Sequence, residues 1–196
     1  MRNQIAGLLV ILSLLTACPA VAHDGSNPYP SGSDNPVFTC DGGVSNSFDV
    51  TGDVINPQTF SLTNLQAIEP STTVQDYFVA GSSTSQGEYS GVLLWDLLNL
   101  VGIQVNPAVK NDLDRKYIVV TGTDCYQAVF AMGEVDPTLG GSDQVTVAYA
   151  QWVSGQETNL GNNGFARLII PGDKKGARSV SNVAHIQVIS VLPPSP

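Results

Sequence analysis

Residues 163–178 read NGFARLIIPGDKKGAR, and this stretch carries the strongest structural and chemical signal in the chain. Its short apolar segment, residues 167–170, precedes Pro171-Gly172, which predicts a strand that ends in a turn. Basic side chains beside a glycine-bearing turn, whose backbone N–H groups can point outward, suit a phosphate or a carboxylate. We therefore expect an anion site here, and an ordinary exposed loop is the alternative. Half of the eight basic residues of the chain lie in this stretch: Arg167, Lys174, Lys175 and Arg178.

This basic cluster stands out because the rest of the chain is acidic, with a formal net charge of −9. Such a charge excludes general attraction to nucleic acid or to anionic lipid, so an anion site has to be local. The length of 196 residues allows one domain. A charged fraction of only 13% together with 19 glycines favours a loop-rich β or α+β domain over a helical bundle.

Most segments outside this stretch have the alternation or the apolar character of strands. The best helix is residues 91–100, GVLLWDLLNL, which Gly102 ends as a C-cap. Residues 81–87 predict a polar turn. The expected fold class is α+β, mainly β, in a single domain. A second short helix is expected at residues 64–68, and strands at residues 47–54, 73–79, 117–121, 125–132, 144–152 and 185–191.

The first 36 residues predict export rather than core structure. Residues 1–22 read as a signal peptide, because Arg2 precedes an apolar run that ends at Ala20-Val21-Ala22. The run is too short to span a membrane stably. Cys18, in a lipobox-like sequence, is an alternative site for a lipid anchor. Residues 23–36 read as a flexible tether and residues 37–192 as the domain, which places it in the periplasm or on the cell surface of a bacterium.

Two of the three cysteines, Cys40 and Cys125, fall in the folded part. In an oxidising compartment a disulfide between them is the expected state. A metal ligand or a reactive thiol at Cys125 is the alternative. No zinc pattern and no Ser-His-Asp spacing occurs, so we predict no metal site from spacing alone. His185 is expected to be an ordinary strand residue, and the acidic residues Asp112, Asp114, Asp136, Asp143 and Glu134 are expected to be solvated loop charges.

Several of these segments resemble, in order, those of sulfite oxidase-type molybdopterin-binding oxidoreductase domains. Residues 163–178 are similar to the closing motif of that family, roughly G-x-P-x-R-[LV]-V-V-P-G followed by a basic loop. Residues 50–65 resemble its opening segment, and residues 91–98 resemble its G-V-x-L-x-D-L-L helix. Tyr126, then Asp136-Pro137 and residues 145–150, resemble the segments between. The resemblance covers about residues 48–191 and implies the sulfite oxidase-like molybdopterin-binding fold.

The resemblance also implies a cofactor, molybdopterin carrying molybdenum, for oxygen-atom transfer. The family holds the metal by the pterin dithiolene and one protein cysteine. In this chain the corresponding position falls at Val79 or Ala80, so the ligand cysteine is absent. By resemblance, Tyr126 and Arg167 would lie at the reacting centre. The residues expected to hold the pterin phosphate are Lys174, Lys175 and Arg178.

Two functions therefore follow from the sequence. The first is an exported oxidoreductase-like domain that binds a pterin cofactor, with an unidentified redox partner protein. The second is a cofactor-free relative that binds a small anion or a partner protein in the cell envelope. The missing cysteine argues against catalysis, and so does a signal peptide with Arg2 as its only arginine, because cofactor-loaded domains of this kind are usually exported through a twin-arginine signal.

Overall fold

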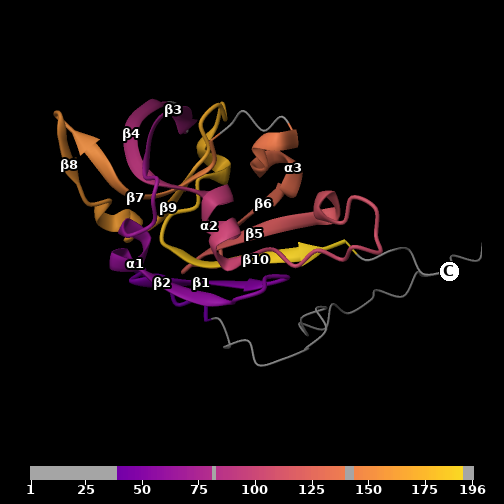
Figure 1. Cartoon of the computed structure of the whole chain (residues 1–196). Coiled ribbons are helices and arrows are strands. Elements are labelled where there is room, and N and C mark those ends of the chain that lie inside the picture. Colours follow the sequence, from indigo (N-terminus) through magenta and orange to yellow (C-terminus); the bar gives the residue numbers. More distant parts are fainter. Residues whose placement is uncertain (1–38, 81–82, 140–143, 192–196) are drawn as a thin grey trace, which may run out of the picture. The chain divides into compact units, whose positions relative to one another are not determined.

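The computed structural model describes residues 39–80, 83–139 and 144–191 (Figure 1). The predicted signal peptide, the tether and Cys18 lie outside the described residues. Strands dominate the described part and form two five-stranded sheets. The predicted α+β, mainly β fold class is therefore confirmed.

The first sheet brings together the two ends of the domain. Its order is β2 (Gln58–Ser61), β1 (Ser47–Gly52), β10 (Val183–Ser190), β5 (Lys116–Gly122) and β6 (Gln127–Ala131). β1 and β10 pair in parallel, and all other neighbours are antiparallel. A parallel pair cannot be joined by a tight turn, and here almost the whole domain forms the connection between its two strands.

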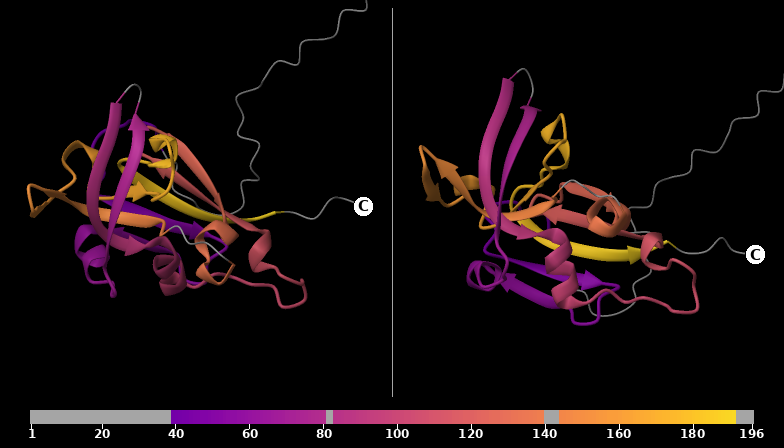
Figure 2. Two further views of the ribbon diagram at one scale, coloured as in Figure 1. Left: turned by 90° about the horizontal axis from the view of Figure 1, so that it is seen from above. Right: turned by 45° about the horizontal axis from the view of Figure 1, so that its top comes forward.

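The second sheet is antiparallel and built around a long hairpin (Figure 2). That hairpin consists of β3 (Thr72–Ala80) and β4 (Ser83–Leu93). β4 also pairs with β7 (Thr146–Val153), which in turn pairs with β8 (Gln156–Thr158) and β9 (Arg167–Ile169). β9 is short and leads directly into the basic loop, so its position on this sheet determines where that loop starts.

Helical elements are short and sit between the strands. The α-helices are α1 (Leu62–Gln66), α2 (Leu94–Val101) and α3 (Met132–Val135). Ser61 caps α1, since its side chain accepts a hydrogen bond from the backbone N–H of Asn64. Four 3₁₀ turns complete the elements of the described part: η1 (Leu113–Arg115), η2 (Pro137–Leu139), η3 (Gly161–Asn163) and η4 (Gly176–Arg178).

Two local predictions were wrong, both along β4. The segment 81–87 was predicted as a polar turn and residues 91–100 as a helix, but the strand runs from Ser83 to Leu93 and the helix begins at Leu94, while residues 81–82 lie outside the described residues. Pairing with β3 from Ser83 to Gly91 makes the rest of the polar segment a strand. Gly91 belongs to that strand through its pairing with β3 and β7, and a Cβ there would lie 2.4 Å from the carbonyl oxygen of Val147 on β7. Only glycine permits so close an approach of the two backbones.

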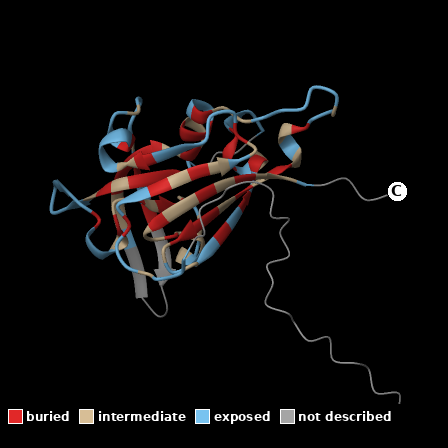
Figure 3. Cartoon of the chain, turned by 90° about the horizontal axis from the view of Figure 1, so that it is seen from below, coloured by how far each residue is buried: buried red, intermediate tan, exposed pale blue. Residues whose placement is uncertain are grey.

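One main hydrophobic core joins both sheets and α2, as the red interior in Figure 3 shows. Phe48, Phe60 and Phe130 from the first sheet are at most 1% exposed, and Leu168 from the second is fully buried. Phe48 also stacks on Phe60, with ring centroids 5.4 Å apart. Each such side chain contributes roughly 1.5–3 kcal/mol when removed from water, so this core fixes the position of the loops that it supports.

Candidate functional site

The basic loop, residues 170–178, runs from the end of β9 to η4, and η4 lies against both β6 and β3 (Figure 1). β6 belongs to the first sheet and β3 to the second. The loop therefore spans the place where the two sheets adjoin. Its backbone turns at Gly172, whose φ of +95° is a conformation that side chains other than glycine rarely adopt.

Arg178 is held by two carboxylates of the protein itself. Its Nε and Nη2 donate to the two carboxylate oxygens of Asp173, at 2.9 and 2.7 Å. Its Nη1 donates to Glu134 Oε1 at 3.0 Å. The guanidinium carbon also lies 5.0 Å from the centroid of the Phe130 ring. These hydrogen bonds, chiefly those with Asp173, raise the pKa of Arg178 above its usual range.

Tyr126 adjoins the same loop from the other side. Its hydroxyl donates a hydrogen bond to the carbonyl oxygen of Ala177, the residue before Arg178. Its backbone N–H donates to Asp124 Oδ1 at 3.0 Å, which fixes the start of the chain into β6. Nearly half of the tyrosine remains exposed. The structure thus brings Tyr126 and Arg178 together at η4, whereas a role for the phenol beside a substrate stays a prediction.

Lys174 and Lys175 lie on the exposed part of the loop. Both are accessible to a ligand from solvent, as an anion site requires. Arg167 lies at the start of β9, half-buried, and its guanidinium carbon is 5.8 Å from the centroid of the Tyr89 ring on β4. Of the five residues predicted for the site, Arg178 is part of η4 and Tyr126 donates to η4 at Ala177. The two lysines are exposed to solvent. Arg167 packs on the second sheet.

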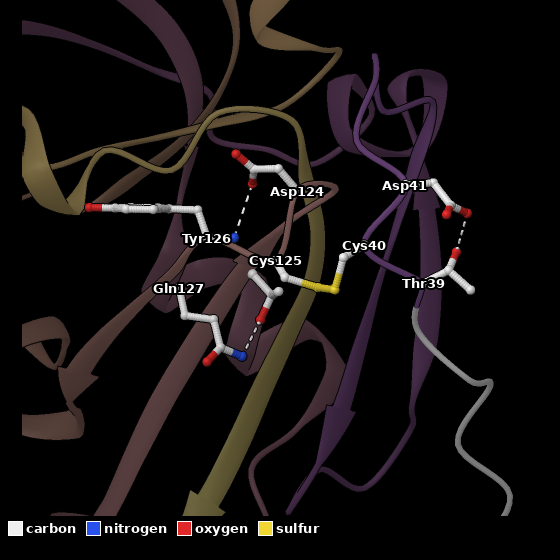
Figure 4. The surroundings of a disulfide bond; sticks show 8 residues. Thr39, Cys40, Asp41, Asp124, Cys125, Tyr126 and Gln127 are labelled. Carbon is white, nitrogen blue, oxygen red and sulfur yellow. Dashed lines mark hydrogen bonds between the residues drawn. A yellow bond between two sulfur atoms is a disulfide. The ribbon is translucent and has the colours of Figure 1, made fainter. Parts of the chain in front are cut away.

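Cys40 and Cys125 form a disulfide, as the sequence predicted (Figure 4). It fastens the first described residues of the chain to the turn that precedes Tyr126. The backbone strengthens this connection, because Gly42 N–H donates to the carbonyl oxygen of Thr123 at 3.0 Å. While bonded to each other, neither sulfur is a thiolate, so the alternative role of Cys125 as a metal ligand or reactive thiol does not fit this state.

The prediction that the acidic residues are solvated loop charges was wrong for Asp112 and Asp136, and Asp143 lies outside the described residues. Asp112 is buried and lies 3.4 Å from the ammonium of buried Lys116. A hydrogen bond from the backbone of Asn106, together with Lys116, holds the pKa of Asp112 below its usual range. Asp136, 3% exposed, accepts hydrogen bonds from the N–H and the hydroxyl of Thr138.

Glu134 is exposed as predicted, but it makes two contacts at the basic loop and α3 that sequence reasoning missed. One of its oxygens accepts from Arg178, and the other accepts from the backbone N–H of Ala131 at 2.9 Å, which caps α3. The usual signal for such a cap is Ser or Thr three positions before the acid. Alanine occupies that position, so the local sequence contained no capping signal, and the contact with Arg178 spans 44 residues.

No helix within the described part of the chain is long and apolar enough to cross a membrane. No group of three or more His, Cys, Asp or Glu side chains within it could hold a metal ion.

The domain thus consists of two sheets with a basic loop where they adjoin. The model of the oxidoreductase molybdopterin binding domain family matches residues 43–195, and the chain belongs to that family. Among solved structures, the crystal structure of the sulfane dehydrogenase SoxCD from Paracoccus pantotrophus is similar, with a TM-score of 0.59 and 19% sequence identity. That match covers 91% of this chain and 57% of the SoxCD chain, and it concerns the fold. No curated protein matches the chain.

The residues present do not fit the molybdenum cofactor as the family resemblance describes it. By that resemblance the thiolate position would fall at Val79 or Ala80 in β3, and neither side chain can ligate a soft metal. The two cysteines of the described domain are bonded to each other. Arg178, the one arginine among the residues predicted to hold the phosphate, already has two carboxylate partners. The residues present therefore lack the thiolate ligand. The positive charge of the Arg178 guanidinium is already balanced by two carboxylates.

Proposed function

We propose that this protein is an exported member of the family that has retained the fold for binding a small anion and does not carry out molybdenum chemistry. The single observation behind this proposal is the Cys40–Cys125 disulfide, which occupies both cysteines of the described domain. With Val79 or Ala80 at the ligand position, no described side chain supplies a thiolate to a metal. Binding would use the exposed ammonium groups of Lys174 and Lys175 on the basic loop.

The electrostatics of the chain support a local rather than a general anion site. The protein as a whole carries −9, so it repels anions at long range, and screening at physiological salt limits that repulsion to about 8 Å. Two adjacent lysines on a turn supply six N–H donors and attract an oxyanion at short range. We expect weak and salt-dependent binding, because both side chains are exposed.

A second candidate function is supported by family membership, which extends over residues 43–195. In this reading the domain binds a pterin cofactor and serves as an exported oxidoreductase, with Tyr126 and Arg167 near the reacting centre. Bound molybdopterin would supply oxygen-atom transfer, and Lys174 and Lys175 would contact its phosphate. The retained tyrosine beside η4 favours this candidate, and the missing thiolate opposes it.

Metal and pterin analysis of protein purified from the envelope of its native host separates the two candidates. The anion-binding function predicts neither molybdenum nor pterin. Near-stoichiometric molybdenum together with a fluorescent pterin would overturn it and would require another ligand, most directly Cys125 in a reduced state. In that case the Cys125→Ser variant would lose the metal.

The mature N-terminus of the same preparation tests the proposed export. Cleavage after Ala22 leaves His23 as the first residue, whereas a lipoprotein begins at a lipid-modified Cys18. Intact-mass analysis distinguishes the two products, and either one supports export. A chain that still begins at Met1 would contradict it.

A further inference from the structure

Arg178 is the most heavily bonded side chain of the basic loop, and its partners come from within the protein. Three of the five N–H donors of a guanidinium donate to Asp173 and Glu134. The two hydrogen bonds to Asp173 form a bidentate pair of the kind that arginine also forms with phosphate. The two carboxylates thus occupy donors of Arg178 that a phosphate group would use.

The charges of this trio oppose an external anion. Two carboxylates against one guanidinium leave a net charge of −1 at the inner side of the loop. Lys174 and Lys175 add two positive charges on its exposed side. Glu134 is the more accessible of the two carboxylates, with 47% of its side chain exposed against 22% for Asp173. Its ion pair with Arg178 is therefore the one that solvent screens more, and the easier one to give up.

Three contacts hold the loop in this closed arrangement. Glu134 connects Arg178 to the start of α3, Tyr126 donates to the Ala177 carbonyl, and the Phe130 ring lies under the guanidinium. Phe130 is fully buried in the core, so it provides a rigid support. The contacts with Tyr126 and Phe130 do not depend on Glu134. Loss of the Glu134 charge would consequently free the Nη1 edge of the guanidinium, while Asp173 keeps its two bonds to Nε and Nη2 and the loop stays in place.

We propose that Asp173 and Glu134 form a latch on Arg178, and that neutralising Glu134 opens the Nη1 edge of this guanidinium to a dianionic phosphate group, to which Lys174 and Lys175 on the same loop add electrostatic attraction. The inference rests on the proposed function in so far as the ligand is the same class of small anion. It differs in assigning Arg178 a latched state, in which the guanidinium does not bind external anions.

The Glu134→Gln variant tests the latch, because glutamine retains an oxygen that can accept from Ala131 N–H while it removes the charge. Binding of inorganic phosphate is measured by isothermal titration calorimetry on the disulfide-bonded domain at low ionic strength. We expect phosphate to bind about two- to fivefold more tightly to Glu134→Gln than to the wild type, the range expected for one partly exposed charge. Adding Arg178→Gln to this variant removes the gain.

Glu157→Gln is the matched control, since Glu157 is exposed on β8 and its loss changes the net charge by the same amount. This variant should leave phosphate affinity within about twofold of the wild type, because Glu157 lies on β8 and is not one of the carboxylates that pair with Arg178. An equal gain in both variants would mean that only net charge matters, and the latch would be overturned. Asp173→Asn provides a second opening variant should Glu134→Gln lose its thermal stability.

The outcomes for the latch and for the proposed function are distinguishable. A wild type that does not bind phosphate, beside a Glu134→Gln variant that does, contradicts the proposed function and supports the latch. A wild type that binds phosphate through Lys174 and Lys175, with no gain in either opening variant, supports the proposed function and contradicts the latch. Methyl phosphate in parallel titrations shows whether the opened site takes the free ion alone or also a phosphate monoester.

Discussion

His185 shows how a single residue on an otherwise ordinary strand acquires a titration that the sequence does not reveal. It lies on β10 opposite Asp49 of β1, and Thr51 Oγ1 is 2.6 Å from its Nε2. Burial disfavours the charged imidazole and lowers the pKa of His185, although the Asp49 charge acts in the opposite direction. The folded domain therefore takes up this proton less readily than the unfolded chain does.

The stability of the domain should consequently fall as the solution is acidified below the ordinary histidine pKa of 6.5. Between that value and the lower folded value, the unfolded state binds more protons, so the free energy of unfolding rises with pH. One histidine contributes a slope of at most about 1.4 kcal/mol per pH unit. Urea unfolding between pH 7.5 and 5 measures this slope.

The His185→Gln variant serves as the reference for that measurement, since it cannot titrate in this range. Its slope between pH 7.5 and 5 should be smaller than that of the wild type. Equal slopes in both proteins would show that other groups produce the whole effect. Asp112, whose pKa is also lowered, acts below its ordinary value of 3.8 and so outside this window.

At the scale of elements, α2 shows why the helix was predictable and its start was not. Leu94, Leu97, Leu98 and Val101 are fully buried on one face, as their spacing of three and four residues indicates. The apolar residues Val92 and Leu93 continue the same pattern, yet they pair with Val147 and Thr146 of β7. A partner strand far along the chain decided that boundary, and hydrophobic periodicity cannot detect such a partner.

Truncation of Leu97 should therefore destabilise the domain far more than truncation of Leu100 on the same helix. Leu97 is fully buried and Leu100 is 54% exposed. Leu97→Ala removes core contacts and leaves a cavity, at a cost of about 2–5 kcal/mol in the free energy of unfolding. Leu100→Ala should change it by less than about 0.5 kcal/mol. Chemical denaturation of both variants makes the comparison, and similar losses would contradict the assigned faces.

At the scale of the whole molecule, the disulfide is the covalent connection between the start of the described chain and its centre. Cys40 and Cys125 are 85 residues apart in sequence, and their Cα atoms are 5.1 Å apart. Closing so long a loop restricts the unfolded chain much more than the folded one. The bond also anchors residues beside the turn that leads to Tyr126, so it supports the site as well as the fold.

Loss of the disulfide should lower the free energy of unfolding by about 2–5 kcal/mol. The thermal midpoint is measured for the wild type with and without a thiol reductant, and for a variant carrying Cys40→Ser and Cys125→Ser. Reductant should lower the wild-type midpoint towards that of the double variant and leave the variant unchanged. A wild type that is indifferent to reduction would show that the bond does not constrain the unfolded state.

Much of the fold and part of the candidate site could be predicted from the sequence. Alternating apolar residues indicated most strands, and two cysteines in a chain predicted to be exported indicated their bond. The ordered segments that resemble the family indicated a fold that the family match over residues 43–195 confirms. Each of these signals is local or additive along the chain, and that is why a single sequence reveals it.

Tertiary structure alone decided which charges neutralise one another. Arg178 was predicted as a phosphate ligand and Glu134 as a solvated charge, and the fold places Arg178 Nη1 3.0 Å from Glu134 Oε1, with the guanidinium over the ring of Phe130. Lys116 likewise meets Asp112 and Asp53, of which Asp53 is 63 residues away in sequence. Sequence spacing determines which face of an element a side chain occupies. Packing of the two sheets determines what that face meets, because Coulomb and hydrogen-bond energies depend on distance in space and on burial.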